Sequence, residues 1–140
     1  MRSKGNNELH VTSTHYDDQI ALDLVRGSQR TVAIHGCEGN ESVAYIGGSD
    51  DRLIELITES LEDIGISVRE APHHISGTQE NNIVNMTQTQ GGGQLELTAQ
   101  LRKELFKNRK SSRKNRENKD NWDDLMYDFA DAMKKAIERA

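Results

Sequence analysis

The sequence has few of the features that tie a chain to a membrane or to an oxidising compartment. It contains a single cysteine, Cys37, so no disulfide can form within the chain, and this fits a reducing compartment. No apolar run approaches the ~20 residues needed to span a bilayer, and no apolar signal-peptide region follows Met1. We therefore expect a cytoplasmic protein with no membrane partner.

Aromatic residues are also scarce, at 4% of the chain, and hydrophobic residues reach only 34%. A core must therefore be built from isoleucine, leucine, valine and alanine. A chain of 140 residues is long enough for one such core. We expect a single domain over residues 1–140.

The net charge of −5 conceals one strongly basic stretch. Residues 107–119 contain seven basic residues and one acid, a net charge of +6, which leaves −11 for the rest of the chain. The stretch has no apolar period, so it is expected to form an exposed basic loop. Such a loop is either a solvated surface or a contact for a polyanion such as nucleic acid.

Short β-branched segments alternate with amphipathic ones along the chain, which predicts an α/β fold with a largely parallel or mixed sheet flanked by helices. The apolar residues of the second helix, Leu53, Ile57 and Leu61 among them, recur at helical spacing. Strands are expected at 9–13, 31–35, 42–47, 66–70 and 94–97. Helices are expected from Asp17 or Asp18 to Arg26, from Ser49 or Asp50 to Gly65, over 98–106, and from Asp120 or Asn121 to Ile137, with Trp122 on the apolar face of the last.

Two of the predicted strands end on side chains that can do chemistry. His35 closes the strand 31–35 and precedes Gly36, and His35-Gly-Cys-Glu38 weakly matches a zinc-binding pattern. Glu96 lies between Leu95 and Leu97, so alternation directs it to the opposite face of the sheet. A buried carboxylate there is suited to act as a general base. The plainer alternatives are a hydrogen-bonded core histidine and a glutamate on an exposed edge strand.

Other polar residues gather in two places. His10, His15 and Asp17 lie close together near the start of the chain. Asn82 and Asn85 fall in a long polar segment, where they serve either as turn residues or as amides that hold a carboxylate substrate. His73 and His74, at the start of that segment, are expected to be solvated, and Cys37 has no identifiable cationic partner that would activate it.

These pieces, in this order, resemble one family. The resemblance is carried by the segments 5–18, 32–36, 47–48, 81–85 and 93–97 and by the helix 122–137, and it spans the chain from about Gly5. They are similar to the phage-type poly-γ-glutamate hydrolases, which have a zinc carboxypeptidase-like α/β fold, a three-layer sandwich. Those enzymes cleave the γ-linked glutamate polymer of Bacillus-type capsules, so the resemblance also implies that this chain comes from a bacterial host or from its prophage.

Carried over to this sequence, the resemblance implies one zinc ion bound by His35, with Glu96 as catalytic base. It places His10, His15 and Asp17 near the cleft in a supporting role. Asn82 and Asn85 match a family motif whose following arginine is Met86 here, which cannot grip a carboxylate as an arginine can.

An early His-Gly-Gly-Gly-x-Glu-like motif of the family is not found, so two of its three protein ligands have no counterpart in this sequence. The resemblance therefore implies an incomplete zinc carboxypeptidase-like domain that associates with itself or with a complementary N-terminal fragment. A non-catalytic module that binds poly-γ-glutamate, and a nucleic-acid-binding phage protein, are the two alternative functions.

Overall fold

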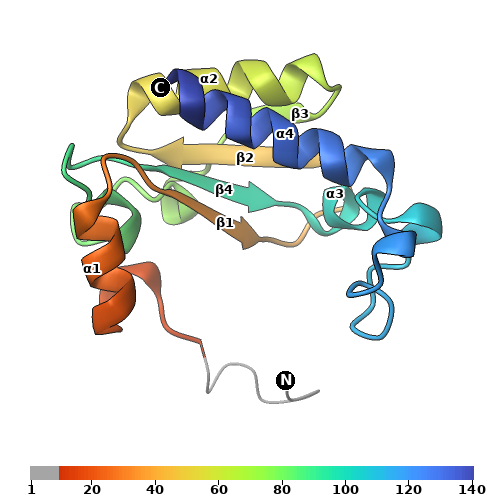
Figure 1. The fold of residues 1–140 in the computed structure, drawn as a ribbon, viewed down its shortest axis with the longest axis horizontal. Helices are drawn as coiled ribbons and strands as arrows, with labels where there is room; N and C mark the ends of the chain where they lie inside the picture. Colours follow the sequence, from red (N-terminus) through yellow and green to blue (C-terminus); the bar gives the residue numbers. More distant parts are fainter. Residues whose placement is uncertain (1–9) are drawn as a thin grey trace.

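A computed structural model describes residues 10–140, which form a four-stranded mixed sheet flanked by helices (Figure 1). The strands are β1 (Val32–Gly36), β2 (Val43–Gly48), β3 (Ser67–Glu70) and β4 (Gly93–Leu97), in the spatial order β1-β4-β2-β3. β1 is parallel to β4 and β2 is parallel to β3, while β2 and β4 are antiparallel. The predicted α/β class is confirmed, and the sheet is mixed.

Helices α2 (Asp51–Asp63) and α4 (Asp124–Arg139) lie side by side over one face of the sheet (Figure 1). Each begins at an aspartate that accepts a backbone N–H, Asp50 from Leu53 and Asp123 from Leu125. Helix α1 (Gln19–Gly27) lies toward the opposite face, and the short helix α3 (Ala99–Glu104) follows β4. Single 3₁₀ turns complete the fold: η2 (Ser13–His15), η3 (His73–Ile75), η4 (Ile83–Asn85), η5 (Lys107–Arg109) and η6 (Lys119–Asn121).

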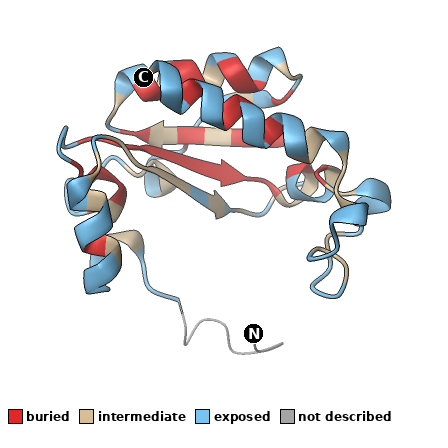
Figure 2. Cartoon of the chain, in the orientation of Figure 1, coloured by how far each residue is buried: buried red, intermediate tan, exposed pale blue. Residues whose placement is uncertain are grey.

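The core lies between the sheet and the two long helices (Figure 2). Leu53, Ile57 and Leu61 of α2 are completely buried, and they belong to one cluster with apolar residues of β2, β4 and α4. Every residue of β4 is buried, because helices cover one of its faces and the chain segment 73–82 approaches the other. Apolar side chains at helical spacing on α2 thus meet the inward side chains of the sheet, as the sequence pattern predicts.

Three details of the sequence prediction are wrong. The expected strand 9–13 is not formed, since residues 10–12 are irregular and the 3₁₀ turn η2 begins at Ser13, while Leu9 lies outside the described residues. On α1 the sequence spacing predicts an apolar face made of Ile20, Ala21, Leu24 and Val25. Ile20 and Leu24 are instead solvent-exposed, at 73% and 67%, and Leu22 is the buried residue of the helix. The last helix begins later than expected, because Asp123 caps it, so Trp122 precedes the helix.

The segment between β3 and β4 is long and polar, yet it is packed against the sheet. Gly47 makes this possible: a Cβ there would lie 2.1 Å from the carbonyl oxygen of Ser76, so only glycine lets the segment approach so closely. Val84 and Thr87 within the segment are buried. The segment therefore forms a wall over one end of the polar face of the sheet.

Truncation of the buried face of α2 will destabilise the fold much more than truncation of α1. We expect Ile57→Ala to lower the free energy of unfolding by about 2–5 kcal/mol, because Ile57 is completely buried. Ile20→Ala, on an exposed side chain, will change it by less than about 0.5 kcal/mol. Urea unfolding of the two variants measures the difference, and equal losses would contradict the assigned core.

Candidate functional site

His35 and Glu96 face the same side of the sheet on neighbouring strands. The parallel pairing of β1 with β4 places them at the same register position. Tyr45 of β2 pairs with Glu96, and Arg69 of β3 pairs with Tyr45, so one polar row crosses the whole sheet. Both strand-end residues singled out in the sequence therefore meet at one place, on the face away from α2 and α4.

A cleft of about 370 Å³ opens over this pair. Its walls come from the chain before α1, from the segment around η3, and from the sheet itself, and they include His10, Thr12, Ser13, Thr14, His35, His73, His74, Ser76, Gly77, Gln79, Asn82, Gln94 and Glu96. Four of the five histidines of the chain thus line one cleft together with one carboxylate.

Glu96 is 8% exposed and lies on an interior strand, so it is not the edge-strand glutamate that the sequence left open. Burial raises the pKa of its carboxyl above the ordinary value, while the proximity of His35 and Arg102 acts in the opposite direction. Among residues 10–140 no fully buried polar side-chain atom lacks a partner, and no hydrogen bond to this carboxylate is formed, so its oxygens face the cleft. Such a carboxylate can accept a proton from a water molecule in the cleft.

Arg102 holds the ends of the two site strands together. Its guanidinium donates to the carbonyl oxygens of Leu97, at 3.2 Å, and Cys37, at 3.0 Å. A side chain at Gly36 would displace it, because a Cβ there would lie 2.8 Å from the guanidinium carbon. Nothing in the sequence marks Arg102 except its place in the helix that follows β4, so sequence reasoning missed it.

Asn82 and Asn85 are buried, and their amides hold the segment in place. Asn82 donates to the side chain of Gln94, at 3.1 Å, and accepts from the backbone of Val84. Asn85 donates to two backbone carbonyls of its own segment and accepts from Ser49. Asn82 also lines the cleft, whereas Asn85 does not. A role in binding substrate remains a prediction for both.

The remaining predicted site residues are divided between the cleft and its surroundings. His10 lines the cleft, whereas His15 and Asp17 do not. The ring of His15 lies 3.1 Å from the hydroxyl of Thr12, and Asp17 is exposed. His73 and His74 are exposed, as expected, yet they line the cleft. Their position depends on the path of a long segment, which no local pattern reveals.

The described residues do not form a complete metal site. Within 10–140 no group of three or more histidine, cysteine, aspartate or glutamate side chains is placed to hold a metal ion. Glu38 is exposed, and Glu41 forms an ion pair with Arg69 at 2.7 Å, so neither completes a site with His35. Catalytic zinc is usually held by three protein ligands. His35 and Glu96 lie side by side, but no third side chain among the described residues is placed to complete a site with them.

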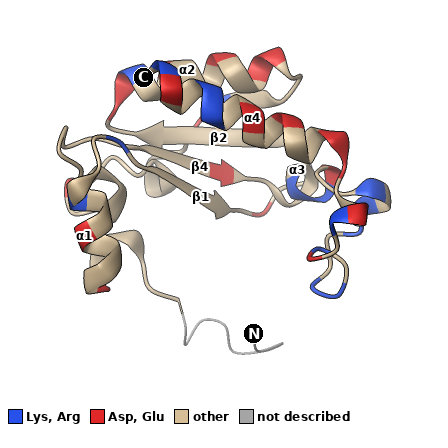
Figure 3. Cartoon of the chain, in the orientation of Figure 1, with Lys and Arg blue, Asp and Glu red and all other residues tan. Residues whose placement is uncertain are grey.

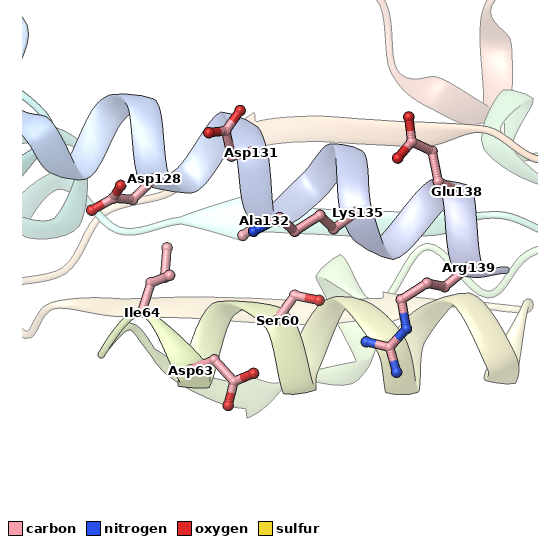
Figure 4. Close-up of a pocket in the computed structure, with 9 residues that line it drawn as sticks. All are labelled: Ser60, Asp63, Ile64, Asp128, Asp131, Ala132, Lys135, Glu138 and Arg139. Carbon is pink, nitrogen blue, oxygen red and sulfur yellow. The ribbon is translucent and has the colours of Figure 1, made fainter.

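A second hollow lies on the outer side of α2 and α4 (Figure 4). Its charged side chains, Asp63, Asp128, Asp131 and Lys135 among them, come from both helices and carry both signs. Its described lining includes no histidine or cysteine, and the two helices form it on the face of the sheet away from Glu96. No helix in residues 10–140 is long and apolar enough to cross a membrane.

Curated relatives come from Bacillus subtilis (strain 168). The chain is 36% identical over 108 residues to the SPbeta prophage-derived UPF0714 protein YoqZ, covering 76% of this chain and 39% of that protein. It is 31% identical over 146 residues to the UPF0714 protein YmaC, covering 99% of this chain and 58% of that one. The chain thus spans between about two fifths and three fifths of these relatives.

Solved structures agree with this relationship. A structure of a bacteriophage poly-γ-glutamate hydrolase superposes with a TM-score of 0.91 at 31% identity, over 99% of this chain and 66% of that one. A zinc-free structure of YndL superposes with a TM-score of 0.87 at 28% identity, over 98% and 67%. The family model for poly-γ-glutamate hydrolase matches residues 1–132. The chain belongs to the poly-γ-glutamate hydrolase family.

Proposed function

We propose that this chain supplies the general base, Glu96, and one metal-binding histidine, His35, of an enzyme that hydrolyses γ-glutamyl amide bonds in poly-γ-glutamate. The observation that carries the proposal is the pairing of these two residues at one register position inside a cleft. Membership of the family supports the substrate class. The burial that raises the pKa of Glu96 supports its role as a base, because a base is most effective when its pKa is near the working pH.

The proton path follows from the position of Glu96. The carboxylate removes a proton from a water molecule, and the water oxygen forms a bond to the carbon of the γ-amide carbonyl. The carbon–nitrogen bond then breaks, and Glu96 returns the proton to the departing amine. The products are a γ-carboxylate and an α-amine, so that each cleavage shortens the polymer. Arg102 positions the base by holding the ends of β1 and β4 together.

Zinc is the metal that we expect at His35, and we propose that polypeptide outside residues 10–140 completes its coordination. A surface suited to that polypeptide is present. β1 is an edge strand, Ile34 on it is 54% exposed, and α1 presents Ile20 and Leu24 to solvent. Free edges and apolar surface of this kind favour association. We propose that the occupant is a complementary fragment, and a second copy of this chain is the alternative.

Hydrolysis of poly-γ-glutamate tests the proposal. The zinc-supplemented chain will be assayed alone and mixed with the third of the phage hydrolase that has no counterpart here. We expect the viscosity of the polymer solution to fall in the mixture, and Glu96→Gln to slow the fall at least about 100-fold, because the base is lost. Glu70→Gln, on an exposed glutamate of β3, serves as the control and will leave the rate unchanged. Activity that survives Glu96→Gln, or no activity in either arrangement, would contradict the proposal.

The raised pKa of Glu96 also predicts a pH dependence of stability in metal-free protein. Glu96 keeps its proton to a higher pH in the folded protein than in the unfolded chain. The free energy of unfolding of the wild type therefore falls as the pH rises from the pKa of Glu96 in the unfolded chain to its pKa in the folded protein. Glu96→Gln removes this loss. Urea unfolding with a chelator present will show the variant to be more stable than wild type at about pH 7, and the gap will be smaller at about pH 4. A stability difference between Glu96→Gln and the wild type that does not change with pH would contradict a raised pKa of Glu96.

A further inference from the structure

We propose that a further cavity, between α3 and the turn 111–116, binds carboxylates of poly-γ-glutamate outside the catalytic cleft. The inference rests on the substrate class proposed above and not on catalysis by this chain. The cavity has a volume of about 410 Å³ and is lined by Leu97, Ala99, Arg102, Lys103, Leu105, Phe106, Ser111 and Arg116. Of the residues that the structure describes, three cationic side chains and no acidic side chain line it.

The charges of α3 are divided between two sides of the helix. Arg102 and Lys103 line the cavity, whereas Glu104 does not. Glu104 accepts hydrogen bonds from Ser42 and from Gln100, and Gln100 in turn accepts from Arg109 at 2.6 Å. The acid of this helix is therefore engaged elsewhere, and it does not line the cavity beside Lys103. Figure 3 shows Lys and Arg residues (blue) on α3 and along the chain that follows it.

The basic stretch is fastened at its base, which fixes one wall of the cavity. The indole of Trp122 donates to the carbonyl oxygen of Arg116 at 2.8 Å, and Asn121 donates to that of Asn115 at 2.9 Å. A β-bridge joins Phe106 to Trp122 across the stretch. The backbone that carries Arg116 is thus held before any ligand arrives, which lowers the entropic cost of binding.

The lining matches the chemistry of γ-linked glutamate better than that of nucleic acid. Each unit of the polymer has two methylene groups in its main chain and one pendant carboxylate. Leu97, Leu105 and Phe106 offer apolar surface to the methylenes, while the cations offer charge to the carboxylates. Single-stranded nucleic acid is usually bound by several aromatic rings that stack on bases, and this cavity has one such ring.

The cavity lies close to the catalytic cleft. Leu97 lines the cavity and directly follows Glu96, which lines the cleft on the other face of the sheet. Arg102 belongs to the cavity, and its guanidinium reaches the carbonyl oxygen of Cys37 at the end of β1. A flexible polymer held in the cavity can therefore pass around the carboxyl ends of β1 and β4 and enter the cleft.

Binding of a labelled short poly-γ-glutamate, measured by fluorescence anisotropy on the Glu96→Gln background, tests the proposal without cleavage. We expect the double variant Lys103→Gln with Arg116→Gln to bind roughly tenfold more weakly, since two charge contacts are lost. The matched control, Lys134→Gln with Lys135→Gln, removes the same charge from α4 and will change affinity less than about twofold. The difference in affinity between the two double variants will shrink at high salt, because salt screens partly exposed charges.

Several outcomes would overturn the proposal. Equal losses in the two double variants would mean that only net charge matters, and no loss in either would mean that the cavity is not used. Tighter binding of a DNA oligonucleotide of equal charge would show that the cavity serves nucleic acid. Lys103→Glu alone, on an exposed side chain that leaves the core intact, repeats the test should the double variant misfold.

The experiments distinguish a failure of the proposed cavity from a failure of the proposed hydrolase. Glu96-dependent hydrolysis that is unaffected in a Lys103→Glu variant with unchanged binding would overturn the cavity alone. Cavity-dependent binding together with no hydrolysis in any arrangement would support the cavity and overturn the proposed enzyme.

Discussion

The parallel pairing of β1 with β4 is the constraint on which the rest of the site depends. Because the two strands run in the same direction, their carboxyl ends meet, and His35 is brought opposite Glu96. α2 and α4 bury the far side of the sheet and so fix the face on which this pair lies. A slip of one residue in this pairing would turn the two side chains to opposite faces and abolish the site.

Much of this arrangement could be predicted from the sequence. The β-branched segment ending at His35 and the alternation around Glu96 place both residues at strand ends, and α2 follows from apolar residues at helical spacing after a capping aspartate. Local chemistry determines these elements, so local patterns reveal them. The expectation for the chain before α1 failed, since that segment has no strand partner among the described residues and its polar side chains bond locally instead.

The rest of the site depends on contacts between distant segments, which no local pattern contains. His73 and His74 reach the cleft because Gly47 lets the segment after β3 approach the sheet. Arg102 serves the site because the turn from β4 into α3 directs it back over Gly36. Met86, which stands where the resemblance implies an arginine, does not line the Glu96 cleft, and no arginine is among the described residues that line it. The basic cavity is a separate place where carboxylates can be held.

Zinc binding tests the central claim most directly, because the account assigns one ligand to this chain and the others to additional polypeptide. Zinc bound per chain is to be measured for the purified protein, alone and mixed with the uncovered third of the phage hydrolase, with His35→Ala beside each. The account predicts well below one zinc for the chain alone, and about one for the mixture, lost in His35→Ala. One zinc per chain that persists in His35→Ala would contradict it, as would no zinc in the mixture.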